Sequence, residues 1–348
     1  MTLAHLDHLH DTLQAPDGTS LHMWWIYAEP TTTFRRRPPT EASYDRFHAS
    51  SEGIACVDDV ARAAVVYLNH HDIHGDDHSL ERARGALAFL QYMQLDDGRF
   101  LNFVVDPELC ETVFGESDPD VVDGVRVDGS PTSEPSHGWW AARACWALGQ
   151  GYETFADADP AFAEELAECI HSYLDVVDEE SLSQYGEYAD AKGVKRPAWL
   201  IEDTYASAPA VLGLASYYRA SGDERSEDRL RKLADGIEEC RGGDAITPPF
   251  GAHLDSSPGA SWHTWGLRQA AALARAGAVL GEESYVDSAR REIAALHAHH
   301  TASHNQIGSF GPAPLPYHQL SYGTDALVQG CTELWQATGE LGFAQLGG

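Results

Sequence analysis

The chain has few basic residues for its length. Its 348 residues include 23 Lys and Arg against 54 Asp and Glu, which gives a formal charge of −31. Binding to nucleic acid or to an anionic membrane requires clustered basic side chains, so we exclude both as partners. Such an acidic surface is typical of proteins adapted to high salt, where ions screen self-repulsion. An ordinary acidic protein is the alternative.

Long hydrophobic runs are also missing. No apolar segment approaches the ~20 residues of a membrane-spanning helix. The opening MTLAHLDHLH lacks the basic start and apolar stretch of a signal peptide. The six cysteines are scattered without a C-x-x-C pair. We interpret five of them, Cys56, Cys145, Cys169, Cys240 and Cys331, as small buried side chains in a reducing compartment. The expected location is the cytoplasm.

Motifs for cofactors and metals are absent or weak. There is no Gly-rich phosphate loop and no serine nucleophile elbow. Residues 118–124 (DPDVVDG) resemble a calcium loop but are out of register. Residues 297–304 (HAHHTASH) contain an H-x3-H step, at the end of a charged helix where a solvated face is the better interpretation. We therefore expect neither a cofactor nor a metal.

Helical periods dominate the chain. Apolar residues recur every three to four positions in segments near 2–14, 57–68, 79–93, 136–152, 204–215, 223–240, 262–280, 282–303 and 321–339, and a further helix begins at Pro160. Those that begin near 57, 136, 204, 262 and 321 are apolar on nearly all sides, which indicates burial. Their partners carry charge runs, such as ERSEDRLRK at 224–232, which are typical of solvated outer helices.

Alternating inner and outer helices predict an all-α fold. The expected architecture is an α/α toroid (barrel) of five or six helical hairpins, forming a single domain over 1–348. Two segments interrupt the helical rhythm, near 97–134 and 179–203, and both precede inner helices. Long loops on one face of a fold usually build a site.

Two adjacent acids, Asp58 and Asp59, begin the apolar helix near residue 57. Adjacent helical positions point about 100° apart, so the two carboxylates cannot have the same task. One of them can cap the helix, where the backbone N–H groups favour negative charge. The other can face whatever lies above the helix end.

Aromatic and polar side chains precede every predicted inner helix. Aromatic rings stack on the C–H faces of sugars, while carboxylates and imidazoles bind hydroxyl groups. This recurrence predicts a groove for an oligosaccharide or glycan at one mouth of the toroid. The expected substrate-binding residues are Trp25, His137, Trp140, Glu202, Trp262, His263 and Tyr322.

Glycoside hydrolysis needs two carboxyl groups across the scissile bond, ~5–5.5 Å apart for retention or ~6.5–9.5 Å for inversion. We expect Glu134, partly desolvated beside Trp139 or Trp140, to have a raised pKa and to act as the acid, while Asp59 stays ionised as base or nucleophile. The alternative is structural: Glu134 with His137 can cap a helix, and either tryptophan can belong to the core. The full set of candidate carboxylates is Asp58, Asp59, Glu134, Asp203 and Asp255. For Asp203, with Glu202, helix capping is again the alternative.

Three motifs resemble those of a microbial family of α/α-toroid proteins associated with glycosyltransferases. They are GIACVDDVARA at 53–63, GRFLNFV at 98–104 and EPSHGWWA at 134–141, which is followed by WALG at 146–149. The departures from the family pattern are Ile54 for Tyr, Val60 for Asn, Pro135 for Asp and Trp139 for Arg. The loss of an acid at 135 argues against a role that needs two acids there.

More broadly, the chain resembles the six-hairpin glycosidase superfamily. This resemblance implies carbohydrate chemistry, and the family implies association with glycosyltransferases. Our first expectation is a glycoside hydrolase acting on a short oligosaccharide. The alternatives are a polysaccharide lyase in which His137 or Tyr322 removes a proton, a sugar epimerase with histidine as acid and base, and a non-catalytic glycan-binding protein.

Overall fold

The computed structural model of the chain describes residues 2–15, 18–26, 28–30, 44–46, 54–104, 121–122, 125–126, 134–191, 194–247, 249–254, 267–297 and 321–348. The chain divides into two compact units, Met1–Leu174 and Asp175–Gly348. The boundary between them falls inside helix α6 (Pro160–Glu180). A single domain over 1–348 stays a prediction.

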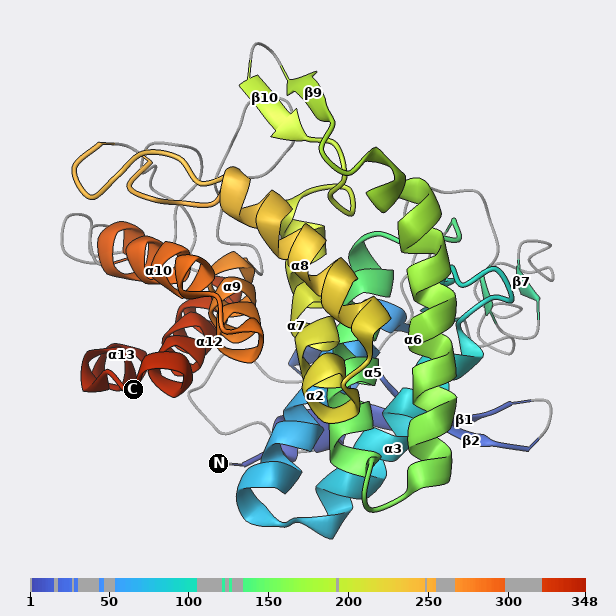
Figure 1. The fold of residues 1–348 in the computed structure, drawn as a ribbon. Coiled ribbons are helices and arrows are strands. Elements are labelled where there is room, and N and C mark those ends of the chain that lie inside the picture. Colours follow the sequence, from blue (N-terminus) through green and yellow to red (C-terminus); the bar gives the residue numbers. More distant parts are fainter. Residues whose placement is uncertain are drawn as a thin grey trace. The chain divides into compact units, whose positions relative to one another are not determined.

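Unit 1 is built from helical hairpins. Helix α2 (Val57–His74) packs against α3 (Asp77–Tyr92) and also against α5 (Trp139–Phe155), as Figure 1 shows. Helix α5 is buried on nearly all sides, from Trp140 to Gly149, which confirms the predicted inner helix. Gln94, just after α3, donates its side-chain N–H to the Cys169 carbonyl of α6 at 3.0 Å.

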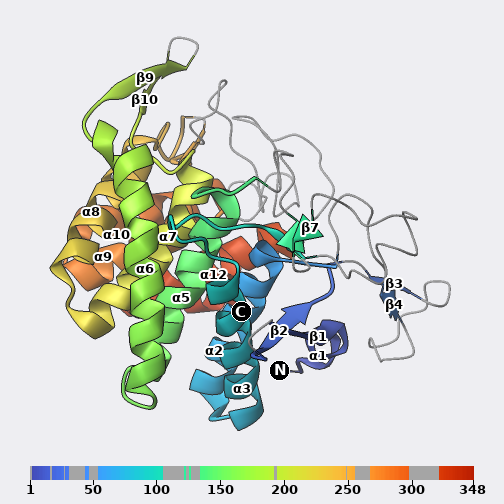
Figure 2. The ribbon, with the colours of Figure 1, turned by 90° about the vertical axis from the view of Figure 1, so that its right-hand side faces the viewer.

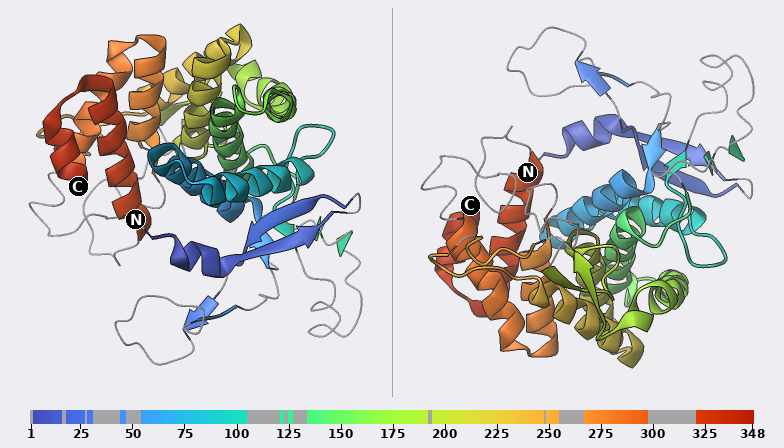
Figure 3. Two further views of the ribbon diagram at one scale, coloured as in Figure 1. Left: turned by 90° about the horizontal axis from the view of Figure 1, so that it is seen from below. Right: turned by 90° about the horizontal axis from the view of Figure 1, so that it is seen from above.

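The N-terminal segment differs from the predicted helix over 2–14. Helix α1 ends at Leu9 (Ala4–Leu9), and strand β1 (His10–Gln14) then pairs antiparallel with β2 (Ser20–Trp24). The hairpin lies along α3 (Figures 2 and 3). Strand β2 buries Leu21 and Met23, and pairing to this buried strand outweighs the weak helical period of residues 10–14.

The other strands of unit 1 are short. Strands β3 (Ala28–Pro30) and β4 (Tyr44–Arg46) pair with each other. A second sheet has the order β5-β6-β8-β7, with two residues in each strand; its members are β5 (Ala55–Cys56), β6 (Phe103–Val104), β7 (Val121–Val122) and β8 (Val125–Arg126). In the described part of the chain, no sheet is larger, as expected for an all-α protein.

Unit 2 continues the hairpins. Helix α7 (Thr204–Ser221) packs on α8 (Glu224–Glu239) and on α9 (Gln269–Leu280). Helix α9 packs on α10 (Glu283–Arg291) and on α12 (Ser321–Thr338), which packs on α13 (Leu341–Gly347). A π-helical segment, Glu292–His297, follows α10 directly. The described residues thus contain five helix pairs, counting α2–α3 and α5–α6 of the first half.

The segment predicted as a site loop over 179–203 is ordered. It contains a 3-10 turn (Leu182–Gln184) and a hairpin of β9 (Tyr188–Ala191) and β10 (Val194–Pro197). In Figure 1 this hairpin extends beyond the end of α8. Of the other predicted loop, 97–134, only 97–104, 121–122, 125–126 and 134 lie among the described residues.

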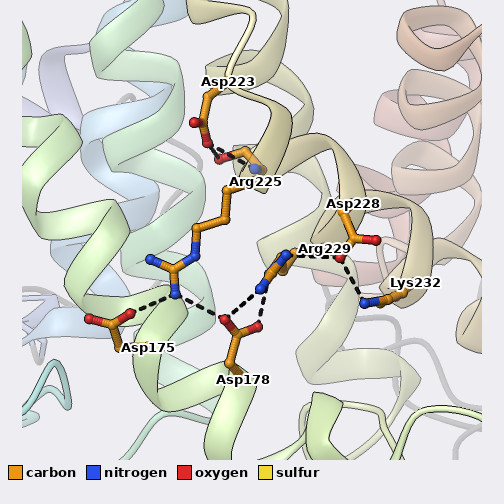
Figure 4. A network of polar contacts seen from close by, with 8 residues as sticks. Asp175, Asp178, Asp223, Arg225, Asp228, Arg229 and Lys232 are labelled. Atoms are coloured by element: carbon orange, nitrogen blue, oxygen red, sulfur yellow. Dashed lines mark hydrogen bonds and ion pairs between the residues drawn. The ribbon is translucent and has the colours of Figure 1, made fainter.

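Ion pairs join the C-terminal part of α6 to α8 (Figure 4). Arg225 contacts Asp175 at 2.6 Å and Asp178 at 2.9 Å, and Arg229 contacts Asp178 at 2.8 Å. Burial raises the pKa of Asp178, but the two guanidinium groups outweigh burial and hold that pKa below its ordinary value. These pairs explain why the outer helix α8 carries the predicted charge run.

Two further expectations concern the chain as a whole. Five cysteines are free thiols, and all but Cys169 are buried, as predicted for small side chains in the core. Among the described helices, none combines the length and apolarity that crossing a membrane requires.

Candidate active site

The N-terminus of α2 presents Asp58 and Asp59. Its N-cap is Cys56, in extended conformation, and the Asp59 backbone N–H donates to the Cys56 sulfur at 3.5 Å. Both acids therefore lie in the first turn, where the helix dipole favours negative charge. The interpretation that one of them is the N-cap is wrong, because a residue upstream takes that position.

Two arginines form ion pairs with Asp58 and Asp59. Arg143 of α5 donates to the Asp58 carboxylate, and Arg62 of α2 pairs with both Asp58, at 3.4 Å, and Asp59. The side chain of Arg143 is 9% exposed, whereas that of Asp59 is 32% exposed. The cluster thus joins α2 to α5, and its most exposed side chain is that of Asp59, at 32% beside 25% for Asp58.

The environment of Asp59 favours its protonated form. Partial burial raises the pKa of Asp59 above its ordinary 3.8, because water is withdrawn from the carboxylate. Arg62 acts in the opposite direction, and the neighbouring charge of Asp58 adds to the increase. Asp59 is therefore a carboxyl group that keeps a proton to a higher pH than a free aspartate.

The segment before α5 and the start of that helix carry other predicted residues. Ser136 pairs with Phe100 as an isolated bridge, and Trp140 donates its indole N–H to the Phe100 carbonyl at 2.9 Å. Trp140 is 7% exposed, so its ring belongs to the core, whereas Trp139 is 40% exposed. Trp139 lies four residues before Arg143, on the same helical face, and offers the accessible ring.

Glu134 and His137 precede α5. Glu134 is exposed, which differs from the partly desolvated acid that was expected there. The His137 carbonyl accepts a hydrogen bond from Tyr173 at 2.8 Å, and His137 is half-buried. The structure therefore gives the desolvated carboxyl to Asp59 and the solvated one to Glu134.

Asp203 caps α7 in unit 2. Its carboxylate accepts the Ala206 N–H at 2.7 Å, and the residue is 8% exposed, so the capping alternative is confirmed. Glu202 beside it is exposed and has a positive φ of 56°. Trp25, in unit 1, donates its indole N–H to Asp11 at 3.0 Å.

Several predicted residues lie outside the described part of the chain. Asp255, Trp262 and His263 are among them, and the side chain of Tyr322 at the start of α12 is not described either. Most of 118–124 and of 297–304 also lies outside. Within the described residues, no group of three or more His, Cys, Asp or Glu side chains is placed to hold a metal ion.

Sequence reasoning missed Arg62 and Arg143. Their signal was present: each is a single cation in an otherwise apolar helical run, ARAAVV at 61–66 and AARACW at 141–146. A buried charge needs a partner, and the acids at 58 and 59 were the nearest candidates in unit 1. Which arginine meets which acid depends on helix packing, which the sequence does not give.

No protein-family model matches the chain, and no curated protein matches its sequence. Solved structures do match. A sugar epimerase from a ruminal bacterium aligns with a TM-score of 0.61 and 15% identity, over 84% of this chain and 73% of that one. Cellobiose 2-epimerase from Bacillus thermoamylovorans gives 0.58 and 11%, over 86% and 76%. A D-mannose isomerase gives 0.53 and 12%, over 84% and 72%.

These matches show the fold. The chain has the α/α-toroid fold of these enzymes, so the predicted fold class is confirmed. None of the three structures is described as acting with a glycosyltransferase, so the expected association has no support.

Proposed function

We propose that the chain is a carbohydrate-active enzyme, and specifically a glycoside hydrolase that uses Asp59 as its acid. The observation that carries the proposal is the raised pKa of an accessible carboxyl group at the N-terminus of an inner helix. Glycoside hydrolysis needs one protonated carboxyl group and one ionised group near neutral pH. The raised pKa of Asp59 makes it the better proton donor of the two groups.

The surrounding residues suit a proton donor. After Asp59 gives its proton to the glycosidic oxygen, it becomes a carboxylate, and Arg62 lies beside it to stabilise that charge. Asp58 is already paired with Arg143 and Arg62, so we assign it to positioning Arg62. The exposed Glu134 is the proposed base, with Trp139 as the stacking ring. This division reverses the roles expected from the sequence.

A sugar epimerase or isomerase is the second candidate. The three structures with the same fold are all described as enzymes that epimerise or isomerise sugars, and this likeness favours the candidate. In such a reaction a protein group removes and returns a proton on a sugar carbon. In this candidate function, Asp59, which lies beside Arg62, removes and returns the proton.

Product analysis separates the two. The chain is incubated at high salt with a panel of oligosaccharides and reducing sugars in D2O, and the products are read by NMR. New reducing ends without deuterium on carbon support the hydrolase. Interconversion of a reducing sugar with deuterium at the epimerised carbon supports the second candidate. Unsaturated uronates, or no product from any sugar, contradict both.

We further infer a reducing compartment, such as the cytoplasm. The support is the five free cysteines, four of which are buried. Burial also raises the pKa of Cys145 to about 12, so this thiol stays protonated and unreactive at neutral pH.

A further inference from the structure

A cavity lies in unit 2, between the 179–203 segment and the end of α8. It has a volume of about 200 Å³ and is lined by residues of the 179–203 segment and of the last turns of α8. Of its lining residues, Trp199 is 2% exposed, while Tyr185 and Tyr188 are 45% and 48% exposed. Both tyrosine rings meet Trp199 edge to face, at 5.2 Å and 5.5 Å.

The tyrosines are held rigidly. The Tyr185 hydroxyl donates to Asp235 at 3.0 Å, and the Tyr188 hydroxyl donates to Glu239 at 2.6 Å. Gly186 between them has a φ of +85°, a backbone conformation that other residues rarely adopt. Exposed rings that are fixed in this way form a preorganised surface rather than two mobile side chains.

The carboxylates of the cavity are poorly compensated. Asp235, Glu238 and Glu239 lie three and four residues apart on one face of α8, where like charges repel. They also lie at the C-terminal end of that helix, where the dipole disfavours anions, and the last turn of α8 has no basic residue. Such local conflict is expected where a site binds something.

Their neighbours do not resolve the conflict. Glu238 pairs with Arg241 at 3.3 Å. Asp235 accepts only the hydroxyls of Tyr185 and Tyr285, and Glu239 only that of Tyr188, in the part of the chain that the structure describes. Phenols are neutral donors, so two negative charges facing the cavity have no cationic partner there.

An ammonium group already lies close to one of the rings. The Lys232 ammonium is 5.4 Å from the centre of the Tyr185 ring, within the range of a cation–π interaction. The Lys232 ammonium forms its ion pair with Asp228, at 2.7 Å. It forms no ion pair with Asp235 or Glu239 among the described residues. The ring and the carboxylates thus suit the same kind of ligand.

We propose that this cavity binds a small organic cation with primary ammonium groups. The simplest member of the class is a diamine, since Asp235 and Glu239 are one helical turn apart and each can accept from one ammonium. The exposed tyrosine rings cover the carbon chain between them. The proposal does not depend on the function assigned to Asp59.

Isothermal titration with putrescine, at low ionic strength, tests the proposal. The matched variants are Glu239→Gln in the cavity and Glu224→Gln, an exposed acid at the other end of α8. Both remove one negative charge from the same helix. We expect Glu239→Gln to weaken binding about tenfold or more, Glu224→Gln to leave it unchanged, and added salt to weaken it in the wild-type chain.

Three results would overturn the proposal. One is the absence of putrescine binding, and another is an equal effect of the two variants, which would indicate general attraction to an acidic surface. The third is a neutral disaccharide binding with the same dependence on Glu239.

Discussion

Asp58 and Asp59 are neighbours in the chain, yet they have different surroundings. Asp58 contacts two arginines, one of them from α5, whereas Asp59 shares only Arg62 and is partly desolvated. The sequence predicts that the pair divides its tasks, because adjacent helical positions diverge. It does not predict which acid is desolvated, because this depends on where α5 places Arg143.

The raised pKa of Asp59 makes a prediction about stability. Between the ordinary pKa of aspartate and the raised one, the folded chain binds more protons at this site than the unfolded chain, so this contribution to stability is lost as pH rises. Asp59→Asn removes the titration. Urea unfolding at pH 4 and pH 7 should show that the variant gains stability relative to wild type at the higher pH. A constant difference between the two would contradict the raised pKa.

Asp203 provides a contrasting test at the residue scale. As the N-cap of α7 it accepts a backbone N–H, so Asp203→Ala should cost about 1 kcal/mol of unfolding free energy. Asp203→Asn keeps an acceptor and should cost less. Thermal unfolding of both variants measures the difference. If Asp203→Asn unfolds like wild type but loses all turnover, the residue is catalytic and the assignment as a cap alone fails.

At the scale of elements, periodicity predicts the long helices well. Helices α2, α3, α7 and α8 lie where their apolar periods place them, although the N-caps of α2 and α3 are Cys56 and Asp76 rather than the residues expected. The prediction fails at 10–14, where a short segment pairs with a buried strand. Local periodicity cannot show this, because the deciding contacts come from residues 20–24 and from α3. The β9–β10 hairpin was missed for the same reason.

Gly85 tests the packing of that N-terminal hairpin on α3. A Cβ at this position would lie 2.2 Å from Cγ of His22, which is itself buried at 8% exposure. We expect Gly85→Ala to destabilise the fold by about 1–3 kcal/mol through overpacking, although alanine favours helices. Gly342→Ala in α13 is the control, because its Cβ meets no atom within 4 Å. Urea unfolding should separate the two, and equal stability would show that the hairpin does not pack closely.

For the whole molecule, composition predicts behaviour as well as class. A formal charge of −31 opposes compaction through self-repulsion. We expect the melting temperature to rise as KCl is increased from 0.1 M to 2 M, since salt screens exposed charges. The ion pairs of Arg225 and Arg229 with α6 weaken under the same conditions, but they are few beside the net charge. A melting temperature that falls with KCl would contradict adaptation to high salt.

The fold class also followed from the sequence, since an alternation of apolar and charged helices suffices to predict a toroid. The site followed only in part. The acids and aromatic residues ahead of the inner helices were recognised by type, but Trp139 and Trp140 could not be told apart without knowing which ring meets Phe100. The cavity beside Trp199 was not predicted, because it combines residues from a hairpin and a helix end.

The proposed enzyme acts on sugars through Asp59. The most direct test is the turnover of Asp59→Asn on the sugar that the panel identifies, beside Asp77→Asn. Asp77 is an exposed acid in the first turn of α3, so the control makes the same change in a similar position. We predict a loss of about 10²–10⁴ in kcat for Asp59→Asn, with no change for Asp77→Asn and the same circular dichroism for both. Near-normal turnover by a folded Asp59→Asn variant would contradict the account.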